Sequence, residues 1–488
     1  MFTMELNTDN RIPLYQQIYE FIKTEIINGN ITSDEKLPSK RTLAKNLGIS
    51  TLTVETAYSQ LNAEGFIYSL PKKGYFASKL KMTAPLATSN SEKKSTATNS
   101  RPAQSQPEYT INFSDSQTDP ESFPFSVWAK LLREVLNTHQ YDVMKNSPAQ
   151  GTLVLRKAIA KHLHQFRGMD VNPDQIVIGA GTEYLYTLLI QLFGFDKTYA
   201  IEDPCHKKIT KIYNSFGVKT VHIPMDEKGI LIKCLNSKKA DIVHISPSHH
   251  FPTGIIMPVT RRYELLNWAS EKSGRYLIED DYDSEFRYKG VPIPSLQALD
   301  RKGKVVYLGT FSKSIAPAIR VSYMVLPPKI AKLYEEKLWF VSSTVSRIDQ
   351  AILYHFLEEG HFERYLNKMR KLYKGKHDLL LDKLRPFRKY FDISGEQAGL
   401  HVILTAKDGK LTEDELLEKA KKQGCHVYCM SHYRLDDMNR ETISKTTEQK
   451  IVEKPTEGLA KLILGYAALS EHDICEGIEK LKMAWEII

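Results

Sequence analysis

The sequence is poor in cysteine and has no long apolar run. Its 488 residues include only five cysteines, an odd number without a CxxC pair or a surrounding His/Cys metal pattern. We therefore expect reduced thiols and no metal site. No run of about 18 apolar residues occurs, and Met1 to Glu5 lack the start of a secretory signal. These absences predict a cytoplasmic protein that does not enter a membrane.

The chain is nevertheless long enough for two or three domains, and its hydrophobic content of 42% supports a large core. The formal net charge of +9 permits an anionic partner without identifying one. Residues 78–108 contain mainly Ser, Thr, Ala, Asn, Pro and Lys, a composition that cannot bury a core. We expect a flexible linker over 79–108 with a mean reach of about 30 Å. It would separate a domain at 1–78 from another at 109–488.

Three helical patterns and a hairpin pattern occupy residues 14–77. The first apolar stripe covers 14–26 and is followed by Asn28-Gly29-Asn30. Ser39 is a suitable N-cap for a second helix that Gly48 ends, and Ser50 or Thr51 can cap a third. Two strand-like segments then flank 71–73. This order predicts a winged helix-turn-helix.

This stretch resembles the GntR-type DNA-binding domain, above all in Leu37-Pro38-Ser39-Lys40-Arg41 and the later Ala57-Tyr58. The resemblance implies double-stranded DNA as a partner. It places DNA contacts at Lys40, Arg41, Ser50, Thr51, Thr53, Lys73 and Gly74. Thr51 stands where the family usually has Arg, so hydroxyl and methyl groups would read the bases. A dimer on paired sites is expected, and a small domain for protein contact is the alternative.

A lysine follows a buried-strand pattern in the second half of the chain. The apolar segment 305–308 leads into Ser312-Lys313-Ser314, with Arg320 downstream. Burial lowers the pKa of an ammonium group, and a neutral amine can attack an aldehyde to form a Schiff base. Ser312 and Arg320 carry donors that suit a phosphate. Taken alone, Lys313 can equally be a loop lysine beside a strand.

Two features earlier in the sequence favour a Schiff-base lysine over a loop lysine at position 313. Asp280 ends an apolar strand pattern, and Tyr282, two residues on, points the same way, whereas Asp281 points to the opposite face. A pyridoxal ring needs a carboxylate at its pyridine nitrogen. Earlier still, Gly181 and Thr182 precede a helix over 183–193, whose first N–H groups suit a phosphate. The three features in this order predict pyridoxal 5′-phosphate as cofactor.

This order resembles the fold-type I, pyridoxal-phosphate-dependent aminotransferases over about 109–488. The resemblance implies an α/β fold with a mostly parallel sheet and a smaller C-terminal α+β subdomain. It makes Lys313 the Schiff-base lysine and pairs Asp280 and Tyr282 with the ring. The other implied cofactor contacts are Ser312, Arg320, Gly181 and Thr182 at the phosphate and His206 stacking on the ring. Arg320 as a structural ion-pair partner is the alternative.

The whole chain resembles the MocR/GabR-type regulators, which join these two domains. The resemblance implies a bacterial transcriptional regulator, a head-to-tail homodimer, that senses an amino compound. Lys208, His432 and Arg434 fall at effector positions, but His432 stands where an Arg would clamp a carboxylate. This departure argues against γ-aminobutyrate and favours another amine, or pyridoxal 5′-phosphate itself, as the signal. The alternative function is a working aminotransferase with an accessory DNA-binding module.

Overall fold

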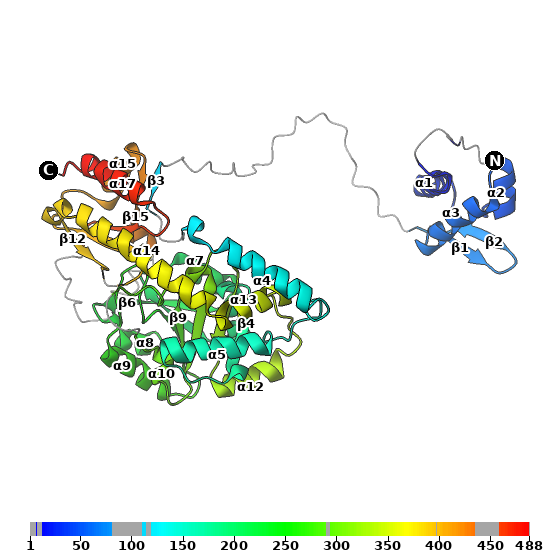
Figure 1. The fold of residues 1–488 in the computed structure, drawn as a ribbon. Coiled ribbons are helices and arrows are strands. Elements are labelled where there is room, and N and C mark those ends of the chain that lie inside the picture. Colours follow the sequence, from blue (N-terminus) through cyan, green and yellow to red (C-terminus); the bar gives the residue numbers. More distant parts are fainter. Residues whose placement is uncertain are drawn as a thin grey trace. The chain divides into compact units, whose positions relative to one another are not determined.

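Two compact units make up the chain, Met1–Gln104 and Ser105–Ile488, and each is described by itself (Figure 1). The computed structural model describes residues 6, 12–80, 110–113, 119–288, 293–396, 398–434 and 458–487. The expected linker over 79–108 lies outside these residues except for 79 and 80. Every helix among the described residues is too short or too polar to cross a membrane.

The smaller unit is a winged helix-turn-helix, which confirms the prediction. Its elements are α1 (Leu14–Ile27), α2 (Lys40–Leu47), α3 (Thr51–Ala63), β1 (Ile67–Leu70) and β2 (Gly74–Ala77). The Ser39 hydroxyl accepts the N–H of Thr42 and starts α2, and Gly48 ends it in the left-handed conformation. Ser50 caps α3 through the N–H of Thr53. One core joins the helices and the hairpin through Ile18, Ile22, Leu43, Val54, Tyr58, Leu61 and Ile67.

The larger unit is built on an eight-stranded sheet of order β4-β11-β10-β9-β8-β5-β6-β7. The five strands from β10 to β6 are parallel, while β11 runs antiparallel to β10 and β4, and β7 to β6. This confirms the mostly parallel sheet. The strands are β4 (Ile176–Gly179), β11 (Ser322–Val325), β10 (Val305–Thr310), β9 (Tyr276–Asp281), β8 (Ile242–Ile245), β5 (Thr198–Asp203), β6 (Lys219–Asp226) and β7 (Gly229–Ile230).

Helices cover both faces of this sheet, which explains why its strands are apolar along their length. Along β10, Val306 and Leu308 pack on one face, while Val305 and Tyr307 pack on the other. The first face carries α6 (Thr182–Phe193), α7 (Lys207–Ser215) and α12 (Pro328–Lys337). The second carries α5 (Leu153–Arg167), α8 (Ile232–Ser237), α9 (Val259–Ser270), α10 (Leu296–Leu299), α13 (Arg347–Glu358) and the first half of α14 (His361–Lys383). Helix α4 (Phe125–Thr138) packs on α13.

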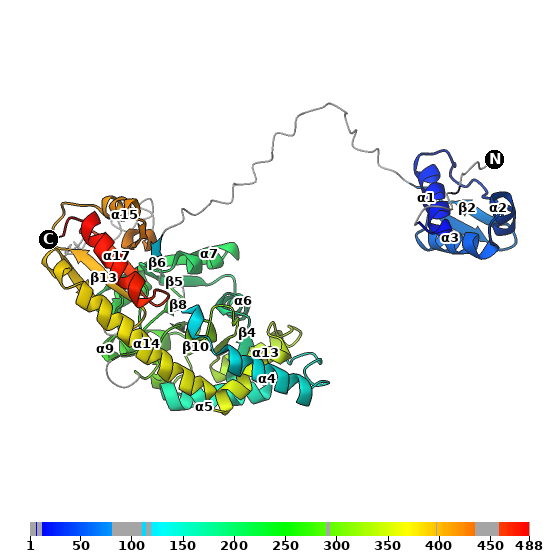
Figure 2. The ribbon, with the colours of Figure 1, turned by 45° about the horizontal axis from the view of Figure 1, so that its top comes forward.

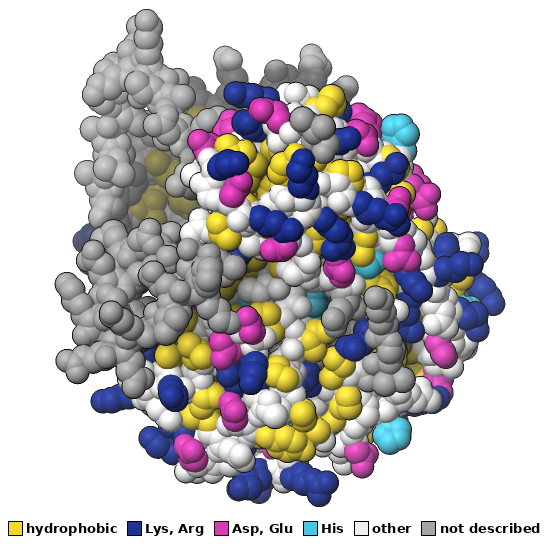
Figure 3. Space-filling view, turned by 90° about the vertical axis from the view of Figure 1, so that its left-hand side faces the viewer, with side chains coloured by type: hydrophobic (Ala, Val, Ile, Leu, Met, Phe, Trp, Pro, Cys, Tyr) yellow, Lys and Arg dark blue, Asp and Glu magenta, His cyan; other side chains and the backbone are white. Residues whose placement is uncertain are grey.

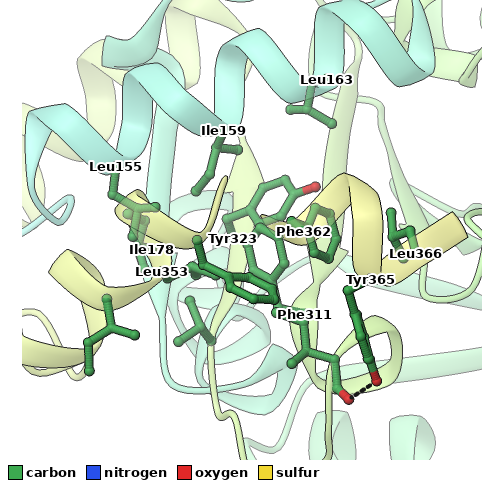
Figure 4. Close-up of a cluster of buried hydrophobic side chains, with 14 of the residues drawn as sticks. Leu155, Ile159, Leu163, Ile178, Phe311, Tyr323, Leu353, Phe362, Tyr365 and Leu366 are labelled. Carbon is green, nitrogen blue, oxygen red and sulfur yellow. Dashed lines mark hydrogen bonds between the residues drawn. The ribbon is translucent and has the colours of Figure 1, made fainter. Parts of the chain in front are cut away.

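A dense aromatic and aliphatic cluster fixes the second face beside the candidate site. Figure 4 shows Leu155 and Ile159 of α5 with Phe311, Tyr323 and Phe362. Phe311 opens α11 (Phe311–Ser314), the short helix that carries Lys313. Tyr365 of α14 donates a hydrogen bond to the carbonyl of Ile315 at 3.0 Å, the dashed line in Figure 4. This core therefore packs against the turn that carries Lys313 and fixes its position.

The smaller C-terminal α+β subdomain is also confirmed. Its sheet has the order β12-β13-β16-β15 and packs against α15 (Glu413–Lys422), α17 (Glu471–Ala484) and the end of α14. Its strands are β12 (Phe391–Ser394), β13 (His401–Ala406), β15 (Tyr428–Cys429) and β16 (Lys461–Gly465), with β3 (Ile111–Asn112) paired to β14 (Cys425–His426). Helix α14 (yellow in Figures 1 and 2) runs from this sheet to the large one. It contributes Phe362 to the large core and Leu380 to the small one.

We predict that Gly309→Ala destabilises the larger unit, because a Cβ at this buried strand position overlaps the ring of Tyr323, which the core encloses. The free energy of unfolding should fall by about 1–3 kcal/mol, measured by urea denaturation. Gly375→Ala is the matched control, since Gly375 lies within α14 with open space around it. That change should raise stability by about 0.5–1 kcal/mol. Equal stability of Gly309→Ala and wild type would contradict this packing.

Candidate functional site

A pocket of about 250 Å³ opens at the carboxyl ends of the parallel strands. Open parallel sheets bind ligands at this edge, because loops and helix N-termini meet there. Lys313, Asp280, Tyr282, Thr182, His206 and Lys208 are the predicted site residues that line it. Gly181, Ser312 and Arg320 adjoin the same pocket, since each flanks or contacts a lining residue. Nine predicted positions therefore come together from segments up to 139 residues apart in sequence, the separation of Gly181 and Arg320.

Lys313 reaches the pocket from a turn that is fixed on both sides. The hydroxyl of Thr310 accepts the N–H of Ser312 at 3.1 Å and starts α11 at the end of β10. The hydroxyl of Ser312 donates to the carbonyl of Ile319 at 2.7 Å, which ties the turn to the segment that carries Arg320. The Lys313 amine thus projects from a rigid support, as a covalent attachment point requires.

Asp280 is held by hydrogen bonds from two sides. Tyr186 of α6 donates to its Oδ2 at 2.6 Å, and Nε2 of His244 lies 3.3 Å from the same oxygen. The hydroxyl of Tyr213 lies 3.0 Å from Nδ1 of His244. With a proton on Nε2 of His244, both of its contacts are hydrogen bonds. Burial and the charge of Asp280 raise the pKa of Tyr186 well above its usual value, so the phenol stays a donor.

Asp281, the neighbouring carboxylate, lies on the opposite face of the sheet. It accepts the Tyr307 hydroxyl at 2.6 Å and pairs with Arg167 of α5 at 2.9 Å. Desolvation would lower the pKa of the Arg167 guanidinium, but the charges of Asp281 and of the other acidic groups around it together outweigh desolvation and raise that pKa. Period-two alternation along β9 thus gives the two adjacent aspartates different environments.

The start of α6 forms a cradle with Arg320. Gly181 has a φ of 95°, which favours glycine, and a Cβ there would overlap the guanidinium of Arg320. Thr182 and Glu183 follow at the helix N-terminus, where backbone N–H groups have no partner within the helix. Arg320 pairs with Glu183 at 2.8 Å and its side chain is 51% exposed. Because Gly181 has no side chain, the guanidinium of Arg320 can approach this helix end.

The pocket lining also contains a buried Glu–His pair that sequence reasoning missed. Glu202 is 3% exposed, and its Oε2 accepts the N–H of Ser246 at 2.9 Å and lies 3.4 Å from Nε2 of His250. Burial raises the pKa of Glu202 to about 8 and lowers that of His250 to about 3. Both groups are therefore neutral near pH 6. The Oε1 of Glu202 has no hydrogen-bond partner among the described residues.

The predicted effector residues separate into two groups. Lys208 of α7 lines the pocket and forms an ion pair with Glu183. His432, on the turn Met430–Tyr433, is exposed, and neither it nor Arg434 is among the described residues that line the pocket. Tyr433 lies nearer, since its carbonyl accepts the N–H of Cys205 at 2.9 Å and its ring centroid is 4.9 Å from that of Phe251.

The residues present fit pyridoxal 5′-phosphate. A lysine amine, a fixed carboxylate and a glycine cradle beside a guanidinium match the aldehyde, the pyridine nitrogen and the phosphate of that molecule. The Glu202 oxygen without a partner adds a polar atom that a ligand can satisfy. Phe251 and His206 line the same pocket as flat groups, with ring centroids 5.9 Å apart.

In the smaller unit, α2, α3 and the hairpin carry the predicted DNA contacts. Arg41, Thr51 and Lys73 are exposed, whereas Lys40 forms an ion pair with Glu55 of α3. The hydroxyls of Ser50 and Thr53 lie 2.8 Å apart in the helix cap. Leu52, which is 71% exposed at the start of α3, was not predicted. An apolar group there can contact a thymine methyl.

The surface of the larger unit carries charges of both signs. On the face shown in Figure 3, Lys and Arg side chains are interspersed with Asp and Glu side chains over the described surface. This view therefore gives no single positive surface that would suit a phosphate backbone. The winged helix remains the part of the chain with the fold of a DNA-binding module.

A winged helix joined to an aminotransferase fold, with a strand-end lysine and carboxylate in its pocket, defines a class of protein. It is a DNA-binding transcriptional regulator whose aminotransferase-like domain has pyridoxal 5′-phosphate as cofactor. Two family models match: aminotransferase class I and II over residues 110–453, and bacterial regulatory proteins, gntR family, over 14–76. The chain belongs to the aminotransferase class I and II family and, within it, to the MocR-type transcriptional regulators.

Relatives of full length support this assignment. The HTH-type transcriptional regulator YdeL of Bacillus subtilis (strain 168) is 38% identical over 99% of both chains. The pyridoxine biosynthesis transcriptional regulator PdxR of Corynebacterium glutamicum is 31% identical over 88% of this chain and 90% of its own. Among solved structures, an archaeal alanine:glyoxylate aminotransferase superposes with a TM-score of 0.65 at 25% identity, covering 78% of this chain and 91% of its own.

The pair of Glu202 and His250 yields a prediction for the pH dependence of stability. Folded Glu202 keeps its proton up to about pH 8, whereas the unfolded side chain loses it near pH 4.3. The folded state therefore loses stability as the pH rises between these values. Relative to Glu202→Gln, wild type should lose up to about 1.4 kcal/mol per pH unit from about pH 5 to 8.

Urea denaturation of both proteins at several pH values measures this difference. Glu336→Gln, which removes an exposed carboxylate paired with Lys332 on α12, is the control. Its stability should follow wild type at every pH. Parallel profiles for wild type and Glu202→Gln would mean that Glu202 is ionised in the folded protein.

Proposed function

We propose that the larger unit is a sensor, which holds pyridoxal 5′-phosphate on Lys313 and responds to an amino compound or to the cofactor itself. Asp280 would accept a hydrogen bond from the pyridine nitrogen, Tyr282 would contact the ring hydroxyl, and His206 would stack on the ring. Ser312, Arg320, Gly181 and Thr182 would bind the phosphate. The bound cofactor supplies an electrophilic carbon that reacts with amines.

The observation that carries this proposal is the support given to Asp280. A carboxylate in a dry pocket is costly unless it is hydrogen-bonded, and here Tyr186 and His244 both serve it. Such a carboxylate faces the same 250 Å³ pocket as Lys313. These groups can hold a protonated pyridine ring in one orientation. Because the same chain carries a DNA-binding unit, binding of the cofactor would alter binding to DNA.

The pocket residues bear on the identity of the signal. His432 is exposed and does not provide the arginine clamp that would bind a carboxylate. Lys208 is already paired with Glu183. A γ-amino acid therefore has a poorer partner here than an amine without a carboxylate. One full-length relative is named as a pyridoxine biosynthesis regulator, which favours the cofactor itself as a second candidate signal.

The proposed assembly is a head-to-tail homodimer that works in the cytoplasm, where its DNA lies. Domains at 1–78 and 109–488, joined by a linker over 79–108, would let two winged helices reach paired half-sites. A single winged helix has little charge with which to bind DNA. Lys40 is paired with Glu55, and helix α3 carries neither Lys nor Arg. Pairing two modules compensates for weak binding by each.

A working aminotransferase is the second candidate function. It is favoured by the lysine, the carboxylate and the phosphate cradle, which an enzyme needs as much as a sensor does. An aromatic-amino-acid aminotransferase of Thermococcus litoralis is 27% identical over 62% of this chain. Steady conversion of an amino acid and a keto acid, without a footprint on DNA, would support the enzyme over the regulator.

The first prediction concerns Lys313. Wild type mixed with pyridoxal 5′-phosphate should develop a visible absorption band that Lys313→Ala lacks, because only a primary amine at that position can link to the aldehyde. Lys376→Ala is not a suitable control, since Lys376 is buried. Lys207→Ala, at the start of α7 with its side chain exposed, is the matched control and should keep the band.

A panel of amines then separates the candidate signals. An amine that shifts the band without steady product formation identifies an amine sensor. If the band forms and no amine moves it, the cofactor is the signal. A band that persists in Lys313→Ala would remove the basis of the proposed sensor.

The second prediction concerns DNA. Arg41→Ala should weaken binding to DNA upstream of the chain's own gene and lower the salt slope of log affinity by about one, since one phosphate contact is lost. Leu52→Ala should leave the salt slope unchanged while relaxing sequence preference. Fluorescence anisotropy at several salt concentrations measures both. Lys161→Ala in the larger unit, where Lys161 pairs with Glu358, serves as control. An unchanged slope for Arg41→Ala would assign the contact elsewhere.

A further inference from the structure

The phosphate cradle already contains an anion that belongs to the chain. Glu183, the second residue of α6, pairs with Arg320 through Oε2 at 2.8 Å. Its other oxygen pairs with the ammonium of Lys208. Both cations are predicted ligand contacts, one for the cofactor phosphate and one for the effector. A single carboxylate therefore bridges the two cations that bound anions would need.

The position of this carboxylate matches that of a bound phosphate in three respects. It lies at a helix N-terminus, beside backbone N–H groups that have no partner within the helix. It contacts the guanidinium that Gly181, by having no side chain, admits to the cradle. It also lines the pocket, as does Lys208. The backbone geometry that favours a phosphate dianion thus also favours Glu183.

Glu183 is ionised at neutral pH. Burial alone would raise its pKa, but the hydrogen bond from Lys208, with the charges of Lys208 and Arg320, outweighs burial and lowers the pKa. The side chains of Glu183 and Arg320 are 35% and 51% exposed. The carboxylate can therefore leave the cradle for solvent without breaking any core packing.

We propose that Glu183 is a built-in competitor of phosphate, which occupies Arg320 until the phosphate group of pyridoxal 5′-phosphate displaces it from that cation. This inference rests on the proposed function for the identity of the ligand, but not for the role of Glu183. Displacement costs the ion pair with Arg320 and leaves a carboxylate near a dianion. Cofactor affinity is consequently weaker than the cradle alone would give, and occupancy varies with cofactor concentration.

The same displacement couples the two predicted subsites. When phosphate takes Arg320, Glu183 retains Lys208 as its remaining cation. Lys208 is then neutralised and does not serve as a partner for a carboxylate on the effector. The consequence for ligand class is that an amine without a carboxylate suits the cofactor-loaded pocket better than an amino acid.

The test compares wild type with Glu183→Gln, which keeps the size of the side chain and removes its charge. Dissociation constants are measured for pyridoxal 5′-phosphate, for pyridoxal, and for inorganic phosphate. Glu183→Gln should bind pyridoxal 5′-phosphate about five- to thirty-fold more tightly, because the partly exposed ion pair with Arg320 no longer competes and no carboxylate is left near the phosphate dianion. Inorganic phosphate should gain affinity as well, and pyridoxal, which lacks the phosphate, should change less than about two-fold.

Two further variants separate competition from other effects. In the Arg320→Gln background, Glu183→Gln should give no further gain, since the contested cation is gone. Glu476→Gln, which removes a carboxylate paired with Lys480 on α17, should leave all three affinities unchanged. Equal or weaker binding of both phosphate ligands by Glu183→Gln overturns the proposal and makes Glu183 a positioning residue for Arg320.

Failure of the proposed function gives a different pattern. If wild type forms no Lys313-dependent absorption band, the cofactor assignment fails. The comparison of inorganic phosphate binding between wild type and Glu183→Gln still decides the role of Glu183. A gain for pyridoxal equal to that for pyridoxal 5′-phosphate would overturn the competition as well, because the effect would then not be directed at the phosphate.

Discussion

The hydrogen bonds that hold Asp280 are the interaction on which the larger unit depends. A buried carboxylate is tolerated only when donors replace the water it has lost. Tyr186 supplies one donor from α6 and His244 supplies another from β8, with Tyr213 of α7 behind it. Two strands and two helices are thereby tied to one oxygen atom. Because α6 is fixed through Tyr186, its N-terminus and the glycine cradle are fixed as well.

The acidic side chains around Asp280 differ in their protonation and in the partners with which they pair. Glu202 lines the same pocket as Asp280 but stays neutral near pH 6, since burial without a cation raises its pKa to about 8. Glu183 also lines the pocket and stays ionised, since two cations hold its pKa low. These two acidic side chains of one pocket thus differ in protonation because their partners differ.

Much of this arrangement follows from local sequence patterns. Residues at strand ends, such as Asp280 and Lys313, were predictable because parallel strands end at one edge of a sheet. The opposite directions of Asp280 and Asp281 follow from period-two alternation. Helix starts at Ser39 and Ser50 follow from capping. The winged helix, the mostly parallel sheet and the smaller C-terminal subdomain were predicted correctly on these grounds together with family resemblance.

The missed residues share a different property. Tyr186 and Asp280 are separated by 94 residues, and Lys40 meets Glu55 on another helix. Such pairs depend on tertiary packing, and a single sequence shows no signal for them. Tyr186 had a local hint, since it lies one helical turn after Thr182 and therefore on the same face of α6. The pairing of Glu183 with Arg320 had none, because 137 residues separate them.

Helix α14 has a mechanical consequence for the larger unit. Its 23 residues give a stiff rod about 34 Å long, with one end in each hydrophobic core. About two thirds of the way along it, the buried ammonium of Lys376 donates to Asp119 and to the carbonyl of Ala467, each at 3.0 Å. A rod held at this point acts as a lever with its longer arm toward the large core. Tilting it by about ten degrees around Lys376 moves the N-terminal end by about 4 Å and the C-terminal end by about 2 Å in the opposite direction, so a shift of the small sheet is felt at the turn that carries Lys313.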